Sequence, residues 1–579
     1  MLTAIREIGR RLRGTNSIDE LSTLIQEPFQ ITPKKPTPVV IFITVNLDRD
    51  KYDGVQLEEY ESTKVDRYLF RKGPSNGPNP MPVAHFTDVE KTFTKKILAW
   101  FKEYQKLDET GMAARLGDVL QKNQQKITQD INDKIKDIDK ETKKLLTVKV
   151  KKKNRCNYLG DLAIFPQLLR QIVNAQVAKG SALNQVCSIC GQKKQVTGDP
   201  RIYRFYTIDK PGFIAGGFNE ANAWKNFPLC YECKLDIEEG RRFVEENLRF
   251  NFYSLEYYLI PRLLVSGVQS ELMEILLDSQ KLISLKSGAK KKITSDNYEI
   301  LETISREKDV LTVNLLFLKK EQSAERILLL IEDIFPSRIK EIFDAKDRVD
   351  ALFQEDDGAG FNFGKVRTFF AKSSEGKKNN DLDKYFLEII DATFLGKKID
   401  FTFLTKFYLA VIRKEFIEDR YFKARVNDAL MGVMFFKELG LLTFQEAKSM
   451  NESIFSNVLT KYGGMLNSPA KQGVFLLGAL TQLLLNKQYA ERGAAPFRKH
   501  LKGLKMDGRD FRALLPKVRN KLEEYGSFDK GKAQIAEEVS RAFLKAGENW
   551  KIAADELNFY FVCGMNLAEE IAGIVYQGK

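Results

Sequence analysis

Four of the six cysteines form two Cys-x-x-Cys pairs whose spacing suits a metal ion. They are Cys187, Cys190, Cys230 and Cys233. A two-residue gap lets both thiolates of a tight turn face one ion, and two such turns complete the tetrahedral four-sulfur shell that Zn²⁺ accepts. Because four protein ligands leave no open position for a substrate, the sequence predicts a structural zinc site. The alternatives are a redox dithiol pair, an iron–sulfur cluster and coincidental core cysteines.

The segment between the two pairs, residues 191–229, interleaves basic, amide and aromatic side chains. Residues 201–206 read Arg-Ile-Tyr-Arg-Phe-Tyr, and a Gly-Gly pair follows at 216–217. Side chains of these kinds contact phosphates and bases, and a metal-bound turn at each end would hold such a loop in shape. The alternative is a structural insertion whose basic residues are only solvated.

The overall charge favours an anionic partner. The chain carries 92 Lys and Arg against 78 Asp and Glu, a formal net charge of +14, and such a surplus raises the local concentration of nucleic acid. The alternatives are a generally basic surface without a partner and an anionic membrane. No stretch approaches the ~20 apolar residues that span a bilayer. The first residues, 1–13, are basic and amphipathic and lack an apolar targeting core. We therefore expect a cytoplasmic protein without a membrane partner, where reduced cysteines favour metal over disulfides.

The scarcity of histidine argues against most hydrolytic enzymes. His85 and His500 are the two histidines in the sequence, which removes histidine-rich metal nucleases and most catalytic triads. The stretch from Gly358 to Val366 resembles a phosphate loop, but its glycine spacing is one residue short and Val366 replaces the metal-binding hydroxyl. We therefore expect that the chain is not an enzyme.

Hydrophobic patterning predicts a multidomain α+β fold. Residues 39–45 form a β-branched run typical of a buried strand, residues 73–82 form a long polar Pro/Gly loop, and Ile127, Ile131 and Ile135 recur at helical spacing. We expect a mixed α/β N-terminal region with a zinc-ribbon-like insert, followed by an all-α C-terminal helical bundle. The expected regions are 1–155 (N-terminal α/β), 156–265 (four-cysteine insert), 266–400 (middle α/β) and 401–579 (helical bundle).

The expected bundle contains a basic stripe between residues 491 and 520, with nine basic and three acidic residues. Such a helical stripe fits a phosphate backbone without reading bases. A solvated basic face is the alternative. The candidate contacts are Arg498, Lys499, Lys502, Lys505, Arg509 and Arg512.

The cysteine segment resembles a known family. Its order is Cys-x-x-Cys, then the stretch FYTIDKPGF at 205–213, then KNFPLCYEC at 225–233. This order is similar to that in the large subunit of the type I-B CRISPR Cascade complex. The segments at 248–261 and 558–567 also look like that family, and about half of the chain carries a usable resemblance.

The resemblance implies a non-catalytic subunit of an RNA-guided DNA surveillance complex. In that family the large subunit lies near the 5′ end of the guide RNA, checks the protospacer-adjacent motif in duplex DNA, helps to open the R-loop and receives a helicase-nuclease, while guide pairing reads the remaining sequence. The implied partners are the guide RNA, target double-stranded DNA, the other Cascade subunits, including the backbone and small subunits, and transiently the helicase-nuclease. The C-terminal bundle resembles the small subunit.

For reading the motif, amide and basic side chains in two loops are the candidates, because they reach base edges and glycines permit close approach. They are Asn219, Asn222 and Lys225 in the insert, and Lys72, Asn76 and Asn79 in the Pro/Gly loop. The alternative function is a stand-alone zinc-ribbon RNA-binding protein, which explains the charge and the cysteines but not the helical tail. An enzyme with an accessory zinc ribbon is a third hypothesis.

Overall fold

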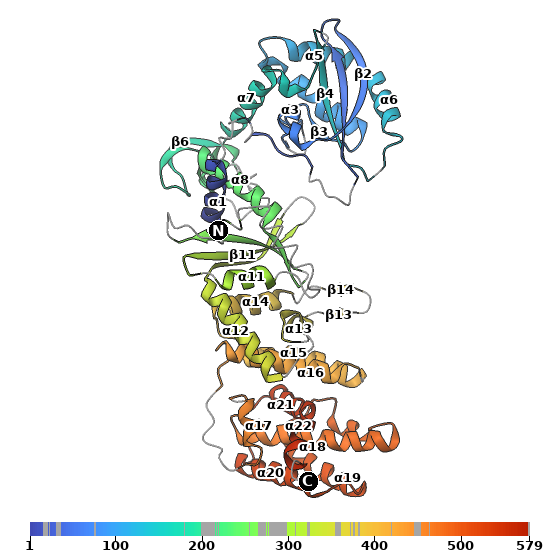
Figure 1. Cartoon of the computed structure of the whole chain (residues 1–579), viewed down its shortest axis with the longest axis vertical. Helices are drawn as coiled ribbons and strands as arrows, with labels where there is room; N and C mark the ends of the chain where they lie inside the picture. Colours follow the sequence, from blue (N-terminus) through green and yellow to red (C-terminus); the bar gives the residue numbers. More distant parts are fainter. Residues whose placement is uncertain are drawn as a thin grey trace. The chain divides into compact units, whose positions relative to one another are not determined.

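In a computed structural model, the chain folds into two compact units (Figure 1). One comprises Leu2–Val244 with Ser323–Glu325, and the other comprises Met1, Glu245–Gln322 and Arg326–Lys579. The structure describes residues 1–15, 21, 24–29, 36–73, 77–139, 141–153, 155–178, 180–197, 215, 217, 219–253, 255–264, 274, 276, 298–306, 308–320, 325–353, 360–370, 372–374, 377–379, 383–418, 420–444, 453–462 and 464–576.

The first unit contains a five-stranded mixed sheet. Its central strands β1 (Val39–Asn46) and β4 (Lys144–Lys152) are parallel, which requires a long crossover between them. The flanking strands are antiparallel to these: β2 (Lys51–Glu59) pairs with β1, and β3 (Ala84–His85) and β5 (Arg155–Asn157) pair with β4. Residues 40–45 are buried, as expected of a β-branched strand covered on both faces.

The crossover from β1 to β4 supplies helices that cover this sheet (Figure 1). Ile127 and Ile131 are fully buried on helix α6, so the predicted amphipathic helix is confirmed. The elements of this part are η1 (Ser62–Lys64), α3 (Val65–Tyr68), the π-helix η2 (Glu90–Leu98), α4 (Ala99–Tyr104), η3 (Gln105–Leu107), α5 (Met112–Lys122) and α6 (Gln124–Ile135), followed after β5 by η4 (Leu159–Asp161) and α7 (Ile164–Ala178).

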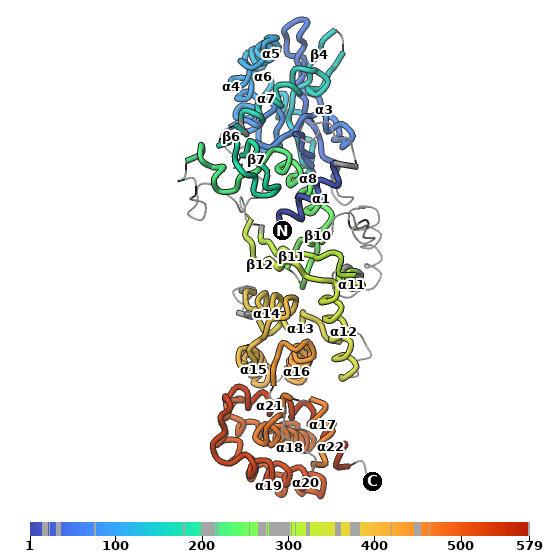
Figure 2. The backbone as a smooth tube through the Cα atoms, turned by 90° about the vertical axis from the view of Figure 1, so that its left-hand side faces the viewer, coloured from blue at the N-terminus to red at the C-terminus, as the bar shows by residue number. Residues whose placement is uncertain are grey.

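The cysteines lie in a small substructure of the same unit. A three-stranded antiparallel sheet, ordered β6 (Ser181–Val186), β7 (Lys193–Thr197), β8 (Leu229–Cys230), leads into α8 (Tyr231–Asn247). The short helix η7 (Glu220–Lys225) lies near β6 and β7. The N-terminal helix α1 (Leu2–Thr15) packs on α8, as both ribbon views show (Figure 2). We call α1, β6–β8, η7 and α8 the cysteine module.

Backbone contact joins α1 to α8. A Cβ atom placed on Gly9 would lie 1.8 Å from the carbonyl oxygen of Asp236, and one on Gly240 would lie 2.0 Å from the carbonyl oxygen of Ile5. Only hydrogen fits at both positions, so the pair of glycines sets the crossing. Beside this crossing, the Asp236 carboxylate forms an ion pair with Arg13 at 2.6 Å and another with Arg6 at 3.4 Å.

The second unit begins with a four-stranded sheet and continues into helices. The sheet order is β12 (Glu325–Ile334), β11 (Leu311–Lys320), β10 (Leu255–Leu263), β9 (Arg249–Phe252). The following elements are α11 (Tyr298–Ser305), α12 (Pro336–Phe353), α13 (Phe363–Thr368), the hairpin β13 (Lys372–Ser374) and β14 (Lys377–Asn379), and α14 (Asp383–Leu395).

From residue 401 the described chain is helical, which confirms the predicted C-terminal bundle. Helix α18 lies among the other helices (Figure 2), and the side chains of residues 473–481 on it are all buried. The bundle consists of α15 (Phe401–Glu418), α16 (Phe422–Glu438), α17 (Ser456–Lys461), α18 (Pro469–Arg492), η9 (Pro496–Leu501), α19 (Gly508–Glu524), α20 (Lys530–Ala546), α21 (Ala554–Asn566) and α22 (Ala568–Tyr576). Among the described helices, none combines the length and the apolar character needed to span a bilayer.

A second pair of glycines sets the crossing of α18 and α21. A Cβ on Gly478 would lie 2.1 Å from the carbonyl oxygen of Phe561, and one on Gly564 would lie 1.8 Å from that of Phe475. The surrounding side chains on both helices are apolar and buried, so this crossing lies inside a hydrophobic core.

Candidate functional site

The structure brings the four predicted cysteines together. One Sγ atom from each of Cys187, Cys190, Cys230 and Cys233 lies within 4.8 Å of the others. The Cys190 and Cys230 sulfurs are 3.9 Å apart, far beyond the ~2 Å of a disulfide bond. All six cysteines are free thiols, and Cys156 and Cys563 lie elsewhere, exposed and buried respectively.

Local backbone geometry positions each pair. In the first pair, the N–H of Gly191 donates to the carbonyl of Cys187 at 2.9 Å, and Gly191 adopts φ +70°, a left-handed conformation that glycine tolerates without strain. The N–H of Ser188 donates to the carbonyl of Pro228 at 2.8 Å and ties the first turn to the strand before the second pair. The second pair spans the end of β8 and the first turn of α8.

Backbone donors act on the sulfurs themselves. The Cys230 N–H lies 3.3 Å from the Cys187 sulfur. Burial raises the pKa of the Cys187 thiol, but hydrogen bonds from the N–H groups of Cys190 and Cys230 outweigh it and lower that pKa to about 7. Burial raises the pKa of Cys230 and of Cys233. The backbone donors thus favour the thiolate form at Cys187, the form in which cysteine binds a metal ion.

These residues fit a tetrahedral metal ion. With Zn–S bonds of about 2.3 Å, a four-sulfur shell has edges of about 3.8 Å, close to the observed Cys190–Cys230 separation of 3.9 Å. Zn²⁺ is the ion that such a donor set accepts best. Four sulfurs complete the shell, so a bound ion would stabilise the fold and leave no position for a reactant.

The lysines near the cluster are engaged with carboxylates. Lys194 forms an ion pair with Glu232 at 2.6 Å, which joins the sheet to α8 across the cluster. Lys234 is buried on α8, with Glu238 3.9 Å from its ammonium group. The two lysines therefore brace the module.

In the insert, the structure describes 191–197, 215, 217 and 219–229, so the basic–aromatic stretch at 201–206 lies outside the described residues. Asn219 caps η7, because its side chain accepts from the N–H of Ala221 at 2.9 Å. Asn222 is half-buried and Lys225 is exposed. Sequence reasoning missed Asn226, whose side chain accepts from the Ala215 N–H at 3.1 Å and ties the loop to η7.

The Pro/Gly loop is less polar than its composition predicts, because residues 78–82 are buried. Asn79 is 6% exposed; its amide donates to the Val83 carbonyl at 2.6 Å and accepts from the Gly73 N–H at 3.0 Å. The Asn79 amide is therefore bound to backbone groups of its own loop. Lys72 is exposed, and Asn76 lies outside the described residues.

Positive charge gathers beside this loop. Burial lowers the pKa of Lys96, and the nearby Lys72 ammonium lowers it further. His85 behaves alike: burial lowers its pKa, with added contributions from Lys72 and Lys143. The Lys96 ammonium also donates to the Gly77 carbonyl of the loop. Lys72 thus lies near both Lys96 and His85, and positive charge at this end of the loop attracts anions.

The basic stripe of the bundle divides into two groups. Arg498 donates to the carbonyl of Phe416, Arg512 donates to the carbonyl of Glu548, and Lys502 pairs with Asp510 at 2.5 Å, so these three brace the fold. Lys499, Lys505 and Arg509 are exposed. Over the residues that the structure describes, no ion pair or hydrogen bond occupies the side chains of this second group.

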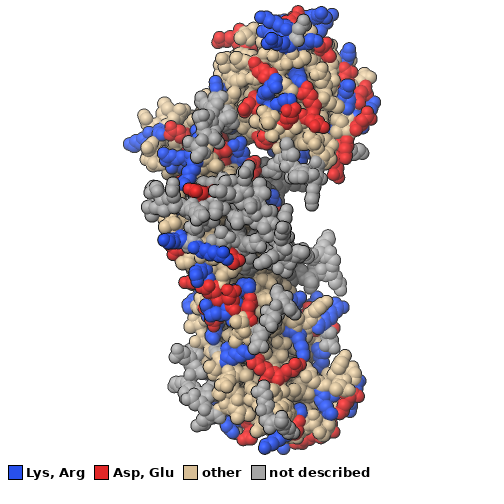
Figure 3. Space-filling model, viewed as in Figure 1, with Lys and Arg blue, Asp and Glu red and all other residues tan. Residues whose placement is uncertain are grey.

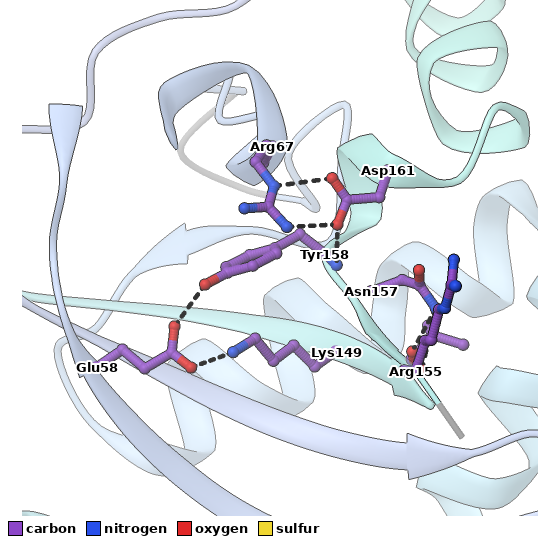
Figure 4. A network of polar contacts seen from close by, with 8 residues as sticks. Glu58, Arg67, Lys149, Arg155, Asn157, Tyr158 and Asp161 are labelled. Atoms are coloured by element: carbon purple, nitrogen blue, oxygen red, sulfur yellow. Dashed lines mark hydrogen bonds and ion pairs between the residues drawn. The ribbon is translucent and has the colours of Figure 1, made fainter. Parts of the chain in front are cut away.

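In another basic run, at residues 149–155, the buried Lys149 belongs to a partly buried network of polar contacts (Figure 4). Lys149 pairs with Glu58, which also accepts from the Tyr158 hydroxyl at 2.7 Å. Burial favours the neutral acid, but these donors outweigh it and lower the pKa of Glu58. Arg67 lies 4.0 Å from the Tyr158 ring centroid and binds Asp161 through two hydrogen bonds of 2.8 Å. Basic and acidic side chains are likewise interspersed on the face drawn in Figure 3.

Comparison with known proteins gives a family for nearly the whole chain. Models of the N-terminal, central and C-terminal domains of CRISPR-associated protein TM1802 (cas_TM1802) match residues 1–171, 184–334 and 361–579 respectively. The central match contains all four clustered cysteines. A comparison with individual curated proteins found no match.

Proposed function

The chain belongs to the CRISPR-associated TM1802 family, and on that premise we propose that it is the large subunit of a Cascade-type, RNA-guided DNA surveillance complex of subtype I-B. The observation that carries the proposal is the succession of three family domains along one chain. The net charge of +14 supports a nucleic-acid partner. The proposed partners are the guide RNA, target double-stranded DNA, the remaining Cascade subunits and, transiently, a helicase-nuclease.

In this proposal the cysteine module is a clamp. A Zn²⁺ ion bound by the four sulfurs would fix both ends of the insert, residues 191–229, and present it to nucleic acid. Lys72, exposed beside the Pro/Gly loop, would provide a phosphate contact on the same unit. Lys72, Lys225, Asn219, Asn222 and Asn76 are the proposed motif-reading residues.

Asn79 has a different proposed role. Both ends of its amide bind the backbone of its own loop, so we assign it to holding that loop rather than to reading bases. The chain itself would perform no catalysis: the four-sulfur site has no open position, and strand cleavage falls to the recruited helicase-nuclease.

Co-expression with the neighbouring genes and a guide RNA tests the role in a complex. The tagged chain should purify with guide RNA, with other protein subunits and with one zinc ion per chain by elemental analysis. Cys156→Ser, at an exposed and isolated cysteine, is the matched control for a cysteine-module variant and should leave assembly intact. Purification free of RNA and of other subunits would overturn the proposal, and RNA without other subunits would favour a stand-alone RNA-binding protein.

Motif reading is tested by comparing duplex DNA with DNA whose target region is already unpaired. Substituting Lys72 and Lys225 by Ala should weaken the binding of the complex to duplex DNA far more than its binding to opened DNA. Lys122, at the end of α5, is an exposed lysine outside both loops and serves as the control. Equal losses on both DNAs would contradict the role in motif reading.

A further inference from the structure

The segment between η9 and α19 has an unusual backbone. Lys502, Gly503 and Leu504 are three successive residues in the left-handed region, with φ of +48°, +60° and +62°. Only glycine adopts this conformation without steric cost, so two of the three positions are strained. Such strain persists where the surrounding structure over-determines it, and it clusters at functional sites.

Buried side chains hold this turn from below. Leu501, Leu504 and Met506 are at most 1% exposed, so buried side chains anchor the chain at three points along this turn. Between and after these anchors, Lys505 and Arg509 are exposed, as is Lys499 just before them. The anchors therefore direct the basic side chains outward.

Two polar side chains from other helices fix the turn. Arg413 on α15 donates to the Leu504 carbonyl at 2.9 Å and pairs with Asp555 at 2.6 Å. Asn558 on α21 is fully buried. Its amide donates to the Met506 carbonyl at 2.7 Å and accepts from the Met506 N–H at 3.2 Å. These contacts reach backbone groups on the strained segment itself.

We propose that Lys499, Lys505 and Arg509 form a preorganised binding surface for the phosphodiester backbone of nucleic acid, and that Arg413 and Asn558 are the positioning residues that hold it. This inference rests on the proposed role of the chain in nucleic-acid binding. The three cations have no internal carboxylate partner within the described part of the chain, whereas Arg498, Lys502 and Arg512 are engaged in the fold. A mobile basic loop would lose conformational entropy when it binds. Because this backbone is already fixed, that cost is avoided and binding is favoured.

The test measures how binding by the purified full-length chain depends on KCl concentration. The probes are a fluorescently labelled single-stranded DNA, its duplex and the RNA of the same sequence, which distinguish the sources of phosphate. Changing Lys499, Lys505 and Arg509 together to Gln should weaken binding at low salt about tenfold. It should also reduce the slope of log affinity against log salt by about 2 on the single strands, since each lost phosphate contact removes about 0.7.

The positioning role of Arg413 and Asn558 is tested by the salt slope of variants at these two residues. Arg413→Gln and Asn558→Ala remove no cation from the surface, yet each should lower the salt slope. Val539→Ala, a cavity variant at a fully buried site on α20, controls for loss of stability and should lower the melting temperature without changing the slope. Arg519→Gln on α19, where the arginine pairs with Glu523, should also leave it unchanged.

A triple variant with an unchanged slope on all three probes would overturn the proposal, as would equal slopes in Arg413→Gln and wild type. Because the assay uses the chain alone with oligonucleotides, those outcomes leave the co-purification test of the proposed function intact. Failure to co-purify with guide RNA would conversely remove the CRISPR role while the salt slopes still report on this surface.

Discussion

The cysteine module and the C-terminal bundle each contain a close crossing of two helices, but different interactions stabilise the two crossings. In both, a pair of glycines lets backbone meet backbone: Gly9 with Gly240, and Gly478 with Gly564. In the bundle the crossing is surrounded by buried apolar side chains. In the module it is flanked by Asp236 and its arginine partners, and one of its two helices, α8, also carries the clustered Cys233.

The difference shows which interactions stabilise a close helix crossing in each region. A long apolar helix such as α18 buries enough surface to fix its own partners, at about 25 cal/mol for each Å² removed from water. The module has three short strands, and we expect it to depend on a bound ion and on ion pairs, as small domains generally do. The two regions should therefore respond to different perturbations.

Removal of the metal should produce the largest effect, and only in the module. Cys230→Ser or a zinc chelator should unfold β6–β8 and the start of α8, because structural zinc contributes roughly 10–16 kcal/mol to the folding of isolated zinc-finger peptides. Hydrogen exchange by mass spectrometry should show lost protection in 181–197 and 229–240, with α18 unchanged. If the module retained its protection without metal, its dependence on the ion would be disproved.

Enlarging a glycine of the bundle crossing should come next. Gly564→Ala places a Cβ against the Phe475 carbonyl, and overpacking of this kind costs about 1–3 kcal/mol. We expect a lower midpoint for the bundle in chemical denaturation and unchanged zinc content. Tyr489→Ala, at a largely exposed position on α18, is the control and should be near neutral. A loss of zinc in Gly564→Ala would show that the two regions are not independent.

Loss of the buried carboxylate of the module should cost less. Asp236→Ala leaves Arg6 and Arg13 without their shared partner and should cost about 2 kcal/mol, as for hydrogen bonds to charged groups. Amides of α1 should then exchange faster while those around the cysteines stay protected. Glu239→Ala on the same helix, where Glu239 forms a surface pair with Arg242, should leave exchange in α1 unchanged.

A small pH effect should be confined to the bundle. Burial would raise the pKa of Asp529, but hydrogen bonds from Lys532 and Tyr576 outweigh it and lower that pKa to about 2. A carboxylate with a depressed folded-state pKa stabilises the fold above its ordinary value near 4 and loses that contribution as pH falls toward 2. The difference in melting temperature between wild type and Asp529→Asn should therefore shrink between about pH 4 and pH 2. A constant difference across that interval would contradict this.

Local patterns in the sequence predicted the elements that depend on local chemistry. The cysteine spacing predicted the cluster, the β-branched run predicted β1, and the period of Ile127 and Ile131 predicted α6. In each case the pattern is carried by residues close together in the chain, or by a residue type, such as cysteine, that binds few kinds of partner.

Contacts between distant segments were not predictable. Nothing in the sequence separates Gly9 and Gly240 from other glycines, so the docking of α1 on α8 could not be inferred. The same holds for the basic stripe, where Arg498 binds a carbonyl on α15 while the adjacent Lys499 faces solvent. Charge is visible in a sequence, but the partner that neutralises it is a property of the fold.

The docking of α1 on α8 has a consequence for how the protein is made. Helix α1 leaves the ribosome before the whole five-stranded sheet, and α8 follows after it. At about 5–20 residues per second, Gly240 emerges roughly 12–46 s after Gly9. Throughout that interval Ala4, Ile5 and Ile8, fully buried in the finished protein, lack their partner surface on the nascent chain. Helix α1 is thus made well before it can dock, and until α8 emerges it offers an apolar face to ribosome-associated chaperones.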